Sequence, residues 1–207
     1  MILKVCGMRN AGNIKAIDEI AAVDWMGFIF YPRSSRYVSD VPAYLPERSK
    51  RVGVFVNATS DYILEKVQLF HLDMIQLHGQ ETPSEIAALS TLLPSDTRII
   101  KMIAISSPAD MAIAKTYEDV TDYLLFETKC HGYGGSGQQF DWNILQLYNG
   151  HTPFILTGGI GPEDAERVKA FSHPRLAGID INSRFETAPA MKDAQSVRTF
   201  AEAIKEP

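Results

Sequence analysis

A carboxylate followed by a glycine-rich segment is the first group of residues in this 207-residue chain that could do chemistry. An apolar run of strand length, residues 123–126, ends at Glu127, and Gly-Gly-Ser-Gly follows at 134–137. Glycine lets backbone N–H groups approach an anion closely, so a carboxylate beside such a loop could combine acid chemistry with phosphate binding. Glycine-rich segments are more often simple connections, and this pattern by itself leaves both interpretations open.

The composition indicates an ordinary globular protein. Hydrophobic residues make up 45% of the chain and charged residues 22%, and the net charge of −5 includes no basic block, which argues against a nucleic-acid partner. No apolar run reaches membrane-spanning length, and the start of the chain is too soon interrupted by Lys4 to be a signal peptide. Two cysteines, Cys6 and Cys130, are too few for a disulfide framework and suggest a reducing, cytoplasmic location. The adjacent Cys130 and His131 have no second pair of ligands at metal-binding spacing, so we predict no metal site.

Predicted strands alternate with predicted helices along the whole chain. The strands are short and apolar, at residues 2–6, 26–30, 52–56, 74–77, 99–103, 123–126, 154–156 and 178–181. The helical patterns are at 13–23, 61–70, 83–93, 108–117, 142–148, 162–171 and 190–204, with the poorest one at 40–45. Thr59 and Thr82 stand where they can cap the second and third of these helices. Strands that are apolar on both faces and alternate with helices predict a parallel sheet covered on both sides.

Eight strand–helix units favour a closed (β/α)8 barrel, a TIM barrel, in a compact version because such barrels typically have about 250 residues. No linker, low-complexity segment or change of composition divides the chain, so we expect a single domain over residues 1–207. An open doubly wound sheet is the alternative, and a Gly-x-Gly-x-x-Gly turn after the first strand would have supported it. The sequence has no such turn there.

In a barrel of this kind the chemistry lies at the carboxyl ends of the strands. The predicted strands end there on polar residues or glycine, which is the pattern expected of an active or binding site. The residues in question are Cys6-Gly7, the segment 31–37, Asn57, His78-Gly79, Ser106-Ser107, Glu127, Thr157-Gly158-Gly159-Ile160 and Asp180-Ile181-Asn182-Ser183.

With those residues in place, the chain resembles the phosphoribosylanthranilate isomerase family of tryptophan biosynthesis. The matching motifs occur in order from the first predicted strand to the last, and they cover essentially the whole chain. They are Lys4-Val5-Cys6-Gly7, Gly27-Phe28-Ile29-Phe30, Ser35-Arg36-Tyr37-Val38, Val52-Gly53-Val54-Phe55-Val56, Gln76-Leu77-His78-Gly79, Gly134-Gly135-Ser136-Gly137 with Phe140-Asp141-Trp142, Gly158-Gly159-Ile160 and Gly178-Ile179-Asp180.

The resemblance implies a (β/α)8 barrel that catalyses an Amadori rearrangement of N-(5-phosphoribosyl)anthranilate without a metal or an organic cofactor. It implies Cys6 as the general base and the carboxylate at the end of strand six as the general acid. That carboxylate is Glu127 here, whereas the family usually has Asp. Glu is longer by one carbon–carbon bond, roughly 1.5 Å. A thiol is mostly protonated at neutral pH, so the basic role of Cys6 needs an electropositive setting, to which Lys4 on the same face of the strand could contribute.

The resemblance also implies the residues that bind the small phosphorylated substrate. Arg36, His78 and Asp180 match substrate-facing positions, and a guanidinium such as that of Arg36 suits the carboxylate of the anthranilate. Barrels commonly bind phosphate on the loops after strands seven and eight. The phosphate-binding candidates are Gly135, Ser136, Gly158, Gly159, Ile160, Asn182 and Ser183. Two further departures from the family are Gln138, where Lys is frequent, and Arg184, where Gly is frequent.

Two other functions compete with this hypothesis. One is a different barrel enzyme acting on a phosphorylated sugar, but such enzymes would prefer two catalytic aspartates or a Schiff-base lysine to a cysteine on strand one. The other is a catalytically silent barrel that binds phosphoribosyl ligands or forms one half of a multienzyme assembly, which the Glu at position 127 keeps open. The sequence does not predict the oligomeric state.

Overall fold

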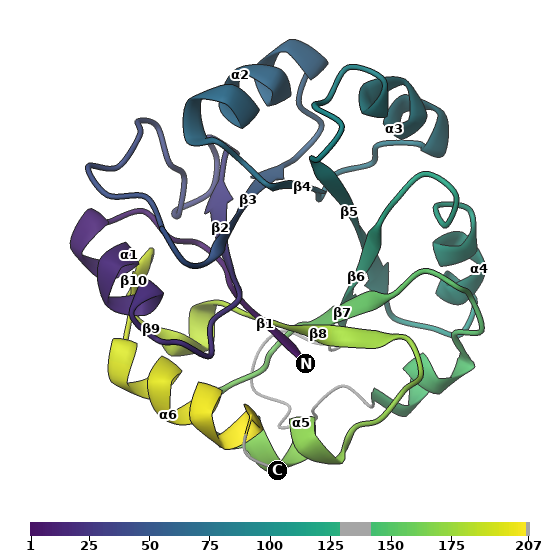
Figure 1. Cartoon of the computed structure of the whole chain (residues 1–207). Helices are drawn as coiled ribbons and strands as arrows, with labels where there is room; N and C mark the ends of the chain where they lie inside the picture. Colours follow the sequence, from purple (N-terminus) through teal and green to yellow (C-terminus); the bar gives the residue numbers. More distant parts are fainter. Residues whose placement is uncertain (129–141, 206–207) are drawn as a thin grey trace.

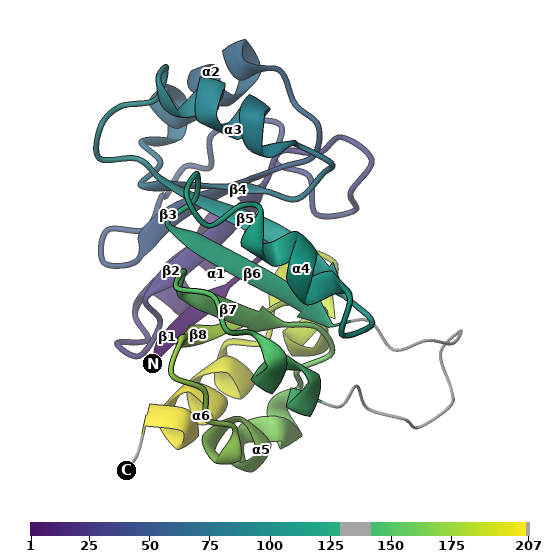
Figure 2. The same cartoon turned by 90° about the vertical axis from the view of Figure 1, so that its right-hand side faces the viewer.

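The computed structural model of the chain describes residues 1–128 and 142–205. Within them, eight parallel strands pair in sequence order and the last pairs with the first, which closes a barrel. Figure 1 looks along this barrel, with the helices in a ring outside the strands, and Figure 2 shows it from the side. The strands are β1 (Ile2–Val5), β2 (Trp25–Ile29), β3 (Lys50–Phe55), β4 (Met74–Leu77), β5 (Arg98–Ile105), β6 (Tyr123–Thr128), β7 (Phe154–Thr157) and β8 (Leu176–Ile181). The predicted TIM barrel and all of its predicted strands are confirmed.

The outer helices bury one face against the barrel. Their α-helical parts are α1 (Ala11–Asp18), α2 (Ser60–Phe70), α3 (Pro83–Ser90), α4 (Asp110–Lys115), α5 (Ala165–Ala170) and α6 (Ala194–Lys205). Thr59 and Thr82 cap α2 and α3 as predicted, each accepting a hydrogen bond from the backbone N–H three residues on, at 3.3 Å. Most of the core lies between these helices and the strands, and it includes Phe28, Phe70, Phe126 and Phe154.

The carboxyl-terminal segment differs from its predicted helix at 190–204. A short 3₁₀ turn, η3 (Ser183–Phe185), leads into an antiparallel hairpin of β9 (Glu186–Ala188) and β10 (Met191–Lys192), and α6 begins only at Ala194. Ala190 has a φ of +65°, which no α-helix tolerates. Asp193 then accepts hydrogen bonds from the backbone of Gln195 and Ser196, and so stabilises the start of α6.

Three other helix predictions need smaller corrections. The segment predicted as a helix at 40–45 contains none, since Pro42 lies within it, Pro46 follows it, and the backbone N–H groups after Pro46 donate to Asp18. The segment 142–148 is a 3₁₀ helix, η1 (Trp142–Leu147). The segment 162–171 begins with the 3₁₀ turn η2 (Pro162–Asp164) before α5.

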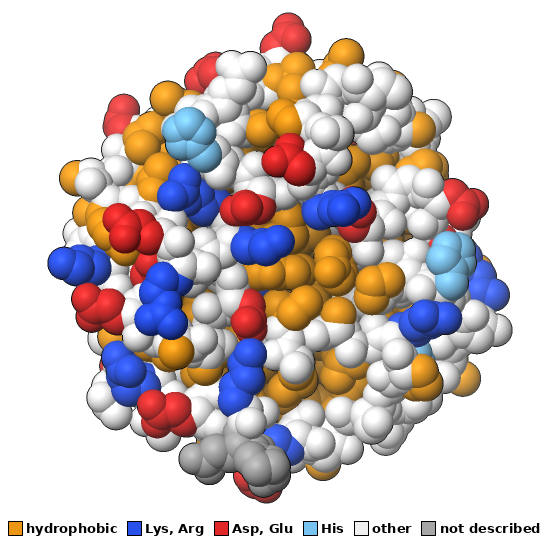
Figure 3. Space-filling view, viewed as in Figure 1, with side chains coloured by type: hydrophobic (Ala, Val, Ile, Leu, Met, Phe, Trp, Pro, Cys, Tyr) orange, Lys and Arg blue, Asp and Glu red, His pale blue; other side chains and the backbone are white. Residues whose placement is uncertain are grey.

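At the amino-terminal end of the barrel, the same hydrogen bond from a strand backbone to an aspartate occurs three times among the described residues. Asp24, Asp73 and Asp122 immediately precede β2, β4 and β6, and each carboxylate accepts a backbone hydrogen bond from the start of the preceding strand. This end faces the viewer in Figure 3, where apolar side chains at the centre are surrounded by charged ones. Behind it, Trp25, Val52, Met74, Ile100, Leu125 and Ile155 form a second apolar cluster that fills the barrel interior. This end is therefore a packed floor, and the space for chemistry lies above it.

Candidate active site

The carboxyl ends of the strands enclose a cavity of about 180 Å³. Its floor includes Val54 and Leu125, and the predicted site residues form much of its wall. Because each of these side chains stands on or just after a strand, the barrel itself fixes their positions. The predicted residues that line the cavity are Cys6, His78, Glu127, Gly158, Gly159, Ile160, Asp180, Asn182 and Ser183.

Cys6 follows β1 and is buried beside two charged groups. A Cβ atom at Gly27 on the neighbouring strand would lie 2.7 Å from Cys6 Sγ, so glycine there leaves room for the thiol. Lys4 is two residues before Cys6 on the same face of the strand and is fully buried. Its Nζ atom lies 3.0 Å from Asp180 Oδ1 on β8. In the described part of the chain neither of these two atoms has a hydrogen bond of good angle, so the contact is an ion pair held by charge.

Burial dominates the ionisation of this group. It raises the pKa of the Cys6 thiol above its usual value, and Asp180 adds to the effect, while Lys4 and Lys192 oppose it. Burial likewise raises the pKa of Asp180 despite the nearby ammonium. For Lys4, burial acts to lower the pKa, but the charge of Asp180 is the main opposing cause and the pKa is raised overall. Lys4 therefore keeps its positive charge next to a thiol whose raised pKa favours the protonated form.

Glu127 and His78 face each other across the cavity wall. Glu127 Oε2 lies 3.8 Å from His78 Nε2, and both side chains are about one third exposed or less. His78 Nδ1 is 3.1 Å from the Gln76 amide nitrogen, which donates to it, so the imidazole carries its proton on Nε2, toward Glu127. Burial lowers the pKa of His78, although Glu127 acts in the opposite direction. His78 is thus a neutral donor positioned to contact the acid or a bound substrate.

The predicted phosphate end of the cavity lies on the loops after β7 and β8. Gly158 and Gly159 have φ of +107° and +68°, a region that favours glycine. A Cβ atom at Gly159 would meet nothing within 4 Å, so this backbone borders open space that a ligand can enter. Arg184 also lines the cavity, and it donates to the Gly159 carbonyl and pairs with Glu163, which joins the two loops.

Arg36 is close to these residues but is held by another side chain. Its Nε and Nη2 atoms donate to the Glu186 carboxylate at 2.8 and 2.6 Å. Glu186 also accepts from Lys192 Nζ at 2.5 Å, and Lys192 in turn donates to Asn182 Oδ1 at 2.8 Å. The sequence predictions do not include Glu186 and Lys192, which both lie in the β9–β10 hairpin. Lys192 falls within the predicted helix at 190–204, and Glu186 lies just before it, where no element is predicted. The signal that could have found them is the Pro-containing break at 186–192, Glu-Thr-Ala-Pro-Ala-Met-Lys, before the amphipathic pattern of α6.

Known proteins that are similar to this chain identify its family. The model of the N-(5'phosphoribosyl)anthranilate (PRA) isomerase family matches residues 3–203. The chain belongs to this family. An N-(5'-phosphoribosyl)anthranilate isomerase of Phocaeicola vulgatus is 52% identical over 206 residues, which cover 100% of this chain and 98% of the relative. The resemblance inferred from the sequence is confirmed, and the chain is an isomerase of tryptophan biosynthesis.

Solved structures of the family have the same barrel. The phosphoribosyl anthranilate isomerase of Thermotoga maritima is 31% identical, with a TM-score of 0.82 and 99% of each chain covered. A second structure, also with a TM-score of 0.82 and 99% of each chain covered, is 29% identical and holds reduced 1-(o-carboxyphenylamino)-1-deoxyribulose 5-phosphate.

Some predicted features of this isomerase lie outside the described residues. They are the phosphate-binding candidates Gly135 and Ser136, the departure at Gln138 and the Cys130-His131 pair. In the described part of the chain, no helix has both the length and the apolar character needed to cross a bilayer.

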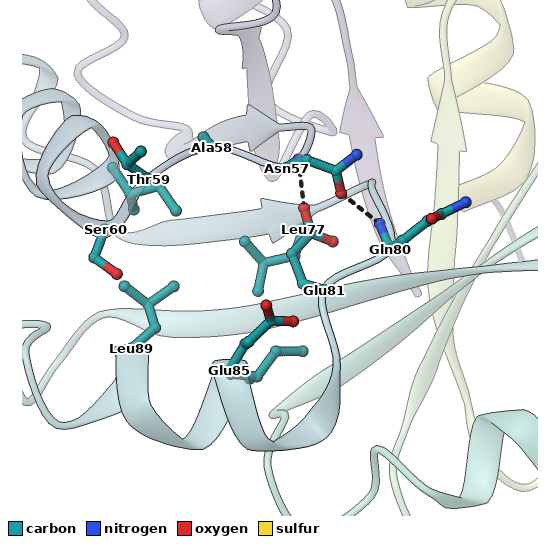
Figure 4. Close-up of a pocket in the computed structure, with 11 residues that line it drawn as sticks. Asn57, Ala58, Thr59, Ser60, Leu77, Gln80, Glu81, Glu85 and Leu89 are labelled. Carbon is teal, nitrogen blue, oxygen red and sulfur yellow. Dashed lines mark hydrogen bonds between the residues drawn. The ribbon is translucent and has the colours of Figure 1, made fainter.

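A larger cavity, about 410 Å³, lies away from the site between α2 and α3 (Figure 4). Its acidic groups are already engaged in the structure. Glu81 accepts from the Asn57 backbone at 2.8 Å and pairs with the buried Lys101 at 2.8 Å, and Glu85 accepts from Thr82. These contacts fix the loops after β3 and β4, so the cavity reflects how the loops are held and offers no comparable set of catalytic groups.

Proposed function

We propose that this isomerase converts N-(5-phosphoribosyl)anthranilate to 1-(2-carboxyphenylamino)-1-deoxyribulose 5-phosphate by an Amadori rearrangement, with Cys6 as general base and Glu127 as general acid. The observation that carries the proposal is that both side chains line one cavity at the carboxyl end of the barrel. The complex of a family member with a reduced 1-(o-carboxyphenylamino)-1-deoxyribulose 5-phosphate supports the choice of ligand.

The reaction needs a proton donor and a proton acceptor on the same sugar. Glu127 donates its proton to the ribose ring oxygen, the bond from that oxygen to the anomeric carbon breaks, and an iminium forms with the anthranilate nitrogen. Cys6 then removes the proton from the neighbouring carbon, and the electron pair of that C–H bond neutralises the iminium. The resulting enolamine becomes the ketone by proton transfers.

The electrostatics of the site fit a base that becomes active only with substrate bound. Burial raises the pKa of the Cys6 thiol above its usual value. An iminium next to the thiol adds a positive charge in a medium of low dielectric, where charges interact more strongly than in water. Together with Lys4 and Lys192, that charge favours the thiolate at the step that needs it.

The remaining contacts divide between the two ends of the substrate. Arg36 binds the anthranilate carboxylate, since a guanidinium matches a carboxylate in shape and charge. His78 and Asp180 lie between the carboxylate-binding end and the phosphate-binding end of the site, and they contact the sugar. The phosphate takes the end formed by Gly158, Gly159 and Ile160 with Asn182 and Ser183. Gly135 and Ser136 stay phosphate-binding candidates from the sequence alone.

The test is the decay of anthranilate-type fluorescence after the substrate is made in situ. The purified protein should accelerate this decay, and Cys6→Ser should lose activity by on the order of 1,000-fold while it keeps its circular dichroism spectrum. The matched control is Cys130→Ser, which removes the other cysteine and should stay active. No acceleration by the wild-type protein would favour the catalytically silent barrel, and a fully active Cys6→Ser variant would assign the base role to another residue.

A further inference from the structure

Three side chains from separate elements meet over Gly7, the residue after Cys6. A Cβ atom at Gly7 would lie 2.7 Å from Arg36 Cδ, 2.8 Å from Asn182 Oδ1 and 3.4 Å from Lys192 Nζ. Gly7 has a φ of +78°, which a side chain would also strain. The loop after β2, the end of β8 and the β9–β10 hairpin therefore converge next to the proposed base.

One buried carboxylate holds the two cations of this group. Glu186 has a side chain only 4% exposed, and its oxygens accept from Arg36 Nε, Arg36 Nη2 and Lys192 Nζ. It also accepts from the backbone of Ala190, which ties it to the far end of its own hairpin. Burying three charged groups costs free energy that only close pairing offsets, so removal of one partner leaves the others uncompensated.

The hairpin is itself anchored, so Glu186 stands on a fixed support. Asn13 of α1 exchanges two hydrogen bonds with the backbone of Lys192, both 2.8 Å long. Phe185, which precedes β9, packs its ring against Phe200 of α6 at 5.0 Å between centroids. These contacts make the hairpin a rigid extension of the barrel that carries Glu186 and Lys192 to the site.

The pairing leaves Arg36 with one edge for a ligand. Its Nε and Nη2 atoms are used on Glu186, and within residues 1–128 and 142–205 the Nη1 atom donates no hydrogen bond. A guanidinium that is clamped along one edge cannot rotate, and its other edge keeps a single orientation. An anionic group of a substrate can then bind without the entropy cost of ordering the arginine.

We propose that Glu186 is a positioning residue, whose carboxylate holds Arg36 for the substrate carboxylate and Lys192 for the thiol of Cys6. This inference rests on the proposed function, because it assumes that Arg36 binds the anthranilate carboxylate and that Cys6 is the base. Beyond the proposed function, the inference says that the β9–β10 hairpin links substrate binding to the charge around Cys6. The link is Glu186, which contacts neither the substrate nor Cys6.

A double-mutant cycle in the fluorescence assay tests this role. Glu186→Gln should raise KM about tenfold, since a misplaced binding group costs affinity. In an Arg36→Met background the same change should raise KM by less than about twofold, because the effects of two mutations are not additive when one residue acts through the other. Lys192→Met should instead lower kcat more than it raises KM. Glu118→Gln is the matched control, because Glu118 is a half-buried carboxylate that accepts from Tyr148 and from the His151 backbone, outside the site. This variant should lower Tm and leave KM unchanged.

Two outcomes separate the inference from the function on which it rests. An equal rise of KM in both backgrounds would make Glu186 merely structural and would overturn the inference alone. An Arg36→Met variant with an unchanged KM would overturn the proposed binding role of Arg36 and, with it, the inference. If Glu186→Gln does not fold, Glu186→Asp replaces it in the cycle, since it keeps the charge and withdraws the carboxylate from Arg36.

Discussion

At the scale of single residues, the proposed base and the proposed acid differ in their surroundings. Cys6 is buried between the ammonium groups of Lys4 and Lys192 and the carboxylate of Asp180, whereas Glu127 is partly exposed at the rim beside His78. In this arrangement the thiol is sensitive to any charge that enters the cavity. The Glu127 carboxylate, by contrast, keeps contact with solvent.

The length of Glu127 gives a direct test of how the acid is placed. Its carboxylate reaches within 3.8 Å of His78 Nε2, and Glu127→Asp would withdraw it by roughly 1.5 Å. We expect kcat to fall by on the order of 100-fold, because a shift of about 1 Å at the reacting groups can have that effect. Glu127→Gln, which cannot donate the proton, should have almost no turnover. A higher kcat for Glu127→Asp would mean that the wild-type Glu is a poorly placed substitute for the usual family Asp.

At the scale of elements, the segment between β2 and β3 shows how a connection is held without a helix. Asp18, at the end of α1, is buried, and its carboxylate accepts from Tyr44 and from the backbone of Glu47, Arg48 and Ser49. These hydrogen bonds replace the ladder that a helix would have supplied. Burial acts to raise the pKa of Asp18, but the donors outweigh it and hold the pKa below its usual value.

Asp18 therefore gives a prediction for stability against pH. Asp18→Asn should reduce the free energy of unfolding at neutral pH by about 3 kcal/mol, since buried backbone donors lose their acceptor. Because the carboxylate has a lower pKa in the folded state, its contribution is present above the unfolded pKa and is lost as the pH falls through the folded one. The difference between the variant and the wild type should thus shrink below about pH 4 in urea titrations. Asp40→Asn, an exposed change in the same segment, is the control, and an equal pH dependence in both variants would contradict the role of Asp18.

At the scale of the whole molecule, the barrel depends on the contact between its first and last strands. β1 pairs with β8 from Ile2 to Val5, and this pairing brings Lys4 opposite Asp180. Gly178 stands opposite Ile2, next to a register shift between β7 and β8. A Cβ atom there would lie 2.2 Å from the Ile2 carbonyl oxygen, so closure of the barrel requires glycine.

Gly178→Ala should therefore destabilise the entire barrel. We expect a loss of about 3 kcal/mol or more in the free energy of unfolding by urea, because the clash is with backbone that cannot move aside. Gly12→Ala is the matched control, since the nearest atom to its new Cβ would be Asn10 Oδ1 at 3.4 Å and alanine favours the helix. A Gly178→Ala variant as stable as Gly12→Ala would show that β1 and β8 can separate locally to admit a side chain.

Local patterns in the sequence were enough for the barrel and for most of the site. The eight strands are short apolar runs bounded by polar residues, and parallel strands necessarily end at the same rim, so Cys6, His78, Glu127 and Asp180 could be assigned to one site from their order alone. The single domain over residues 1–207 and the individual site roles stay predictions.

Only the tertiary structure decided how the charged side chains pair. Glu186 and Arg36 are 150 positions apart, and although Pro189 marks a break before α6, nothing in that segment indicates the partners of Lys192. The hairpin is held there by the close pairing of Glu186 with Lys192 and Arg36 and by the hydrogen bonds from Asn13, in a segment that Pro189 interrupts. The pairing of these charged side chains depends on contacts between segments that are distant in the sequence, and no local pattern contains that information.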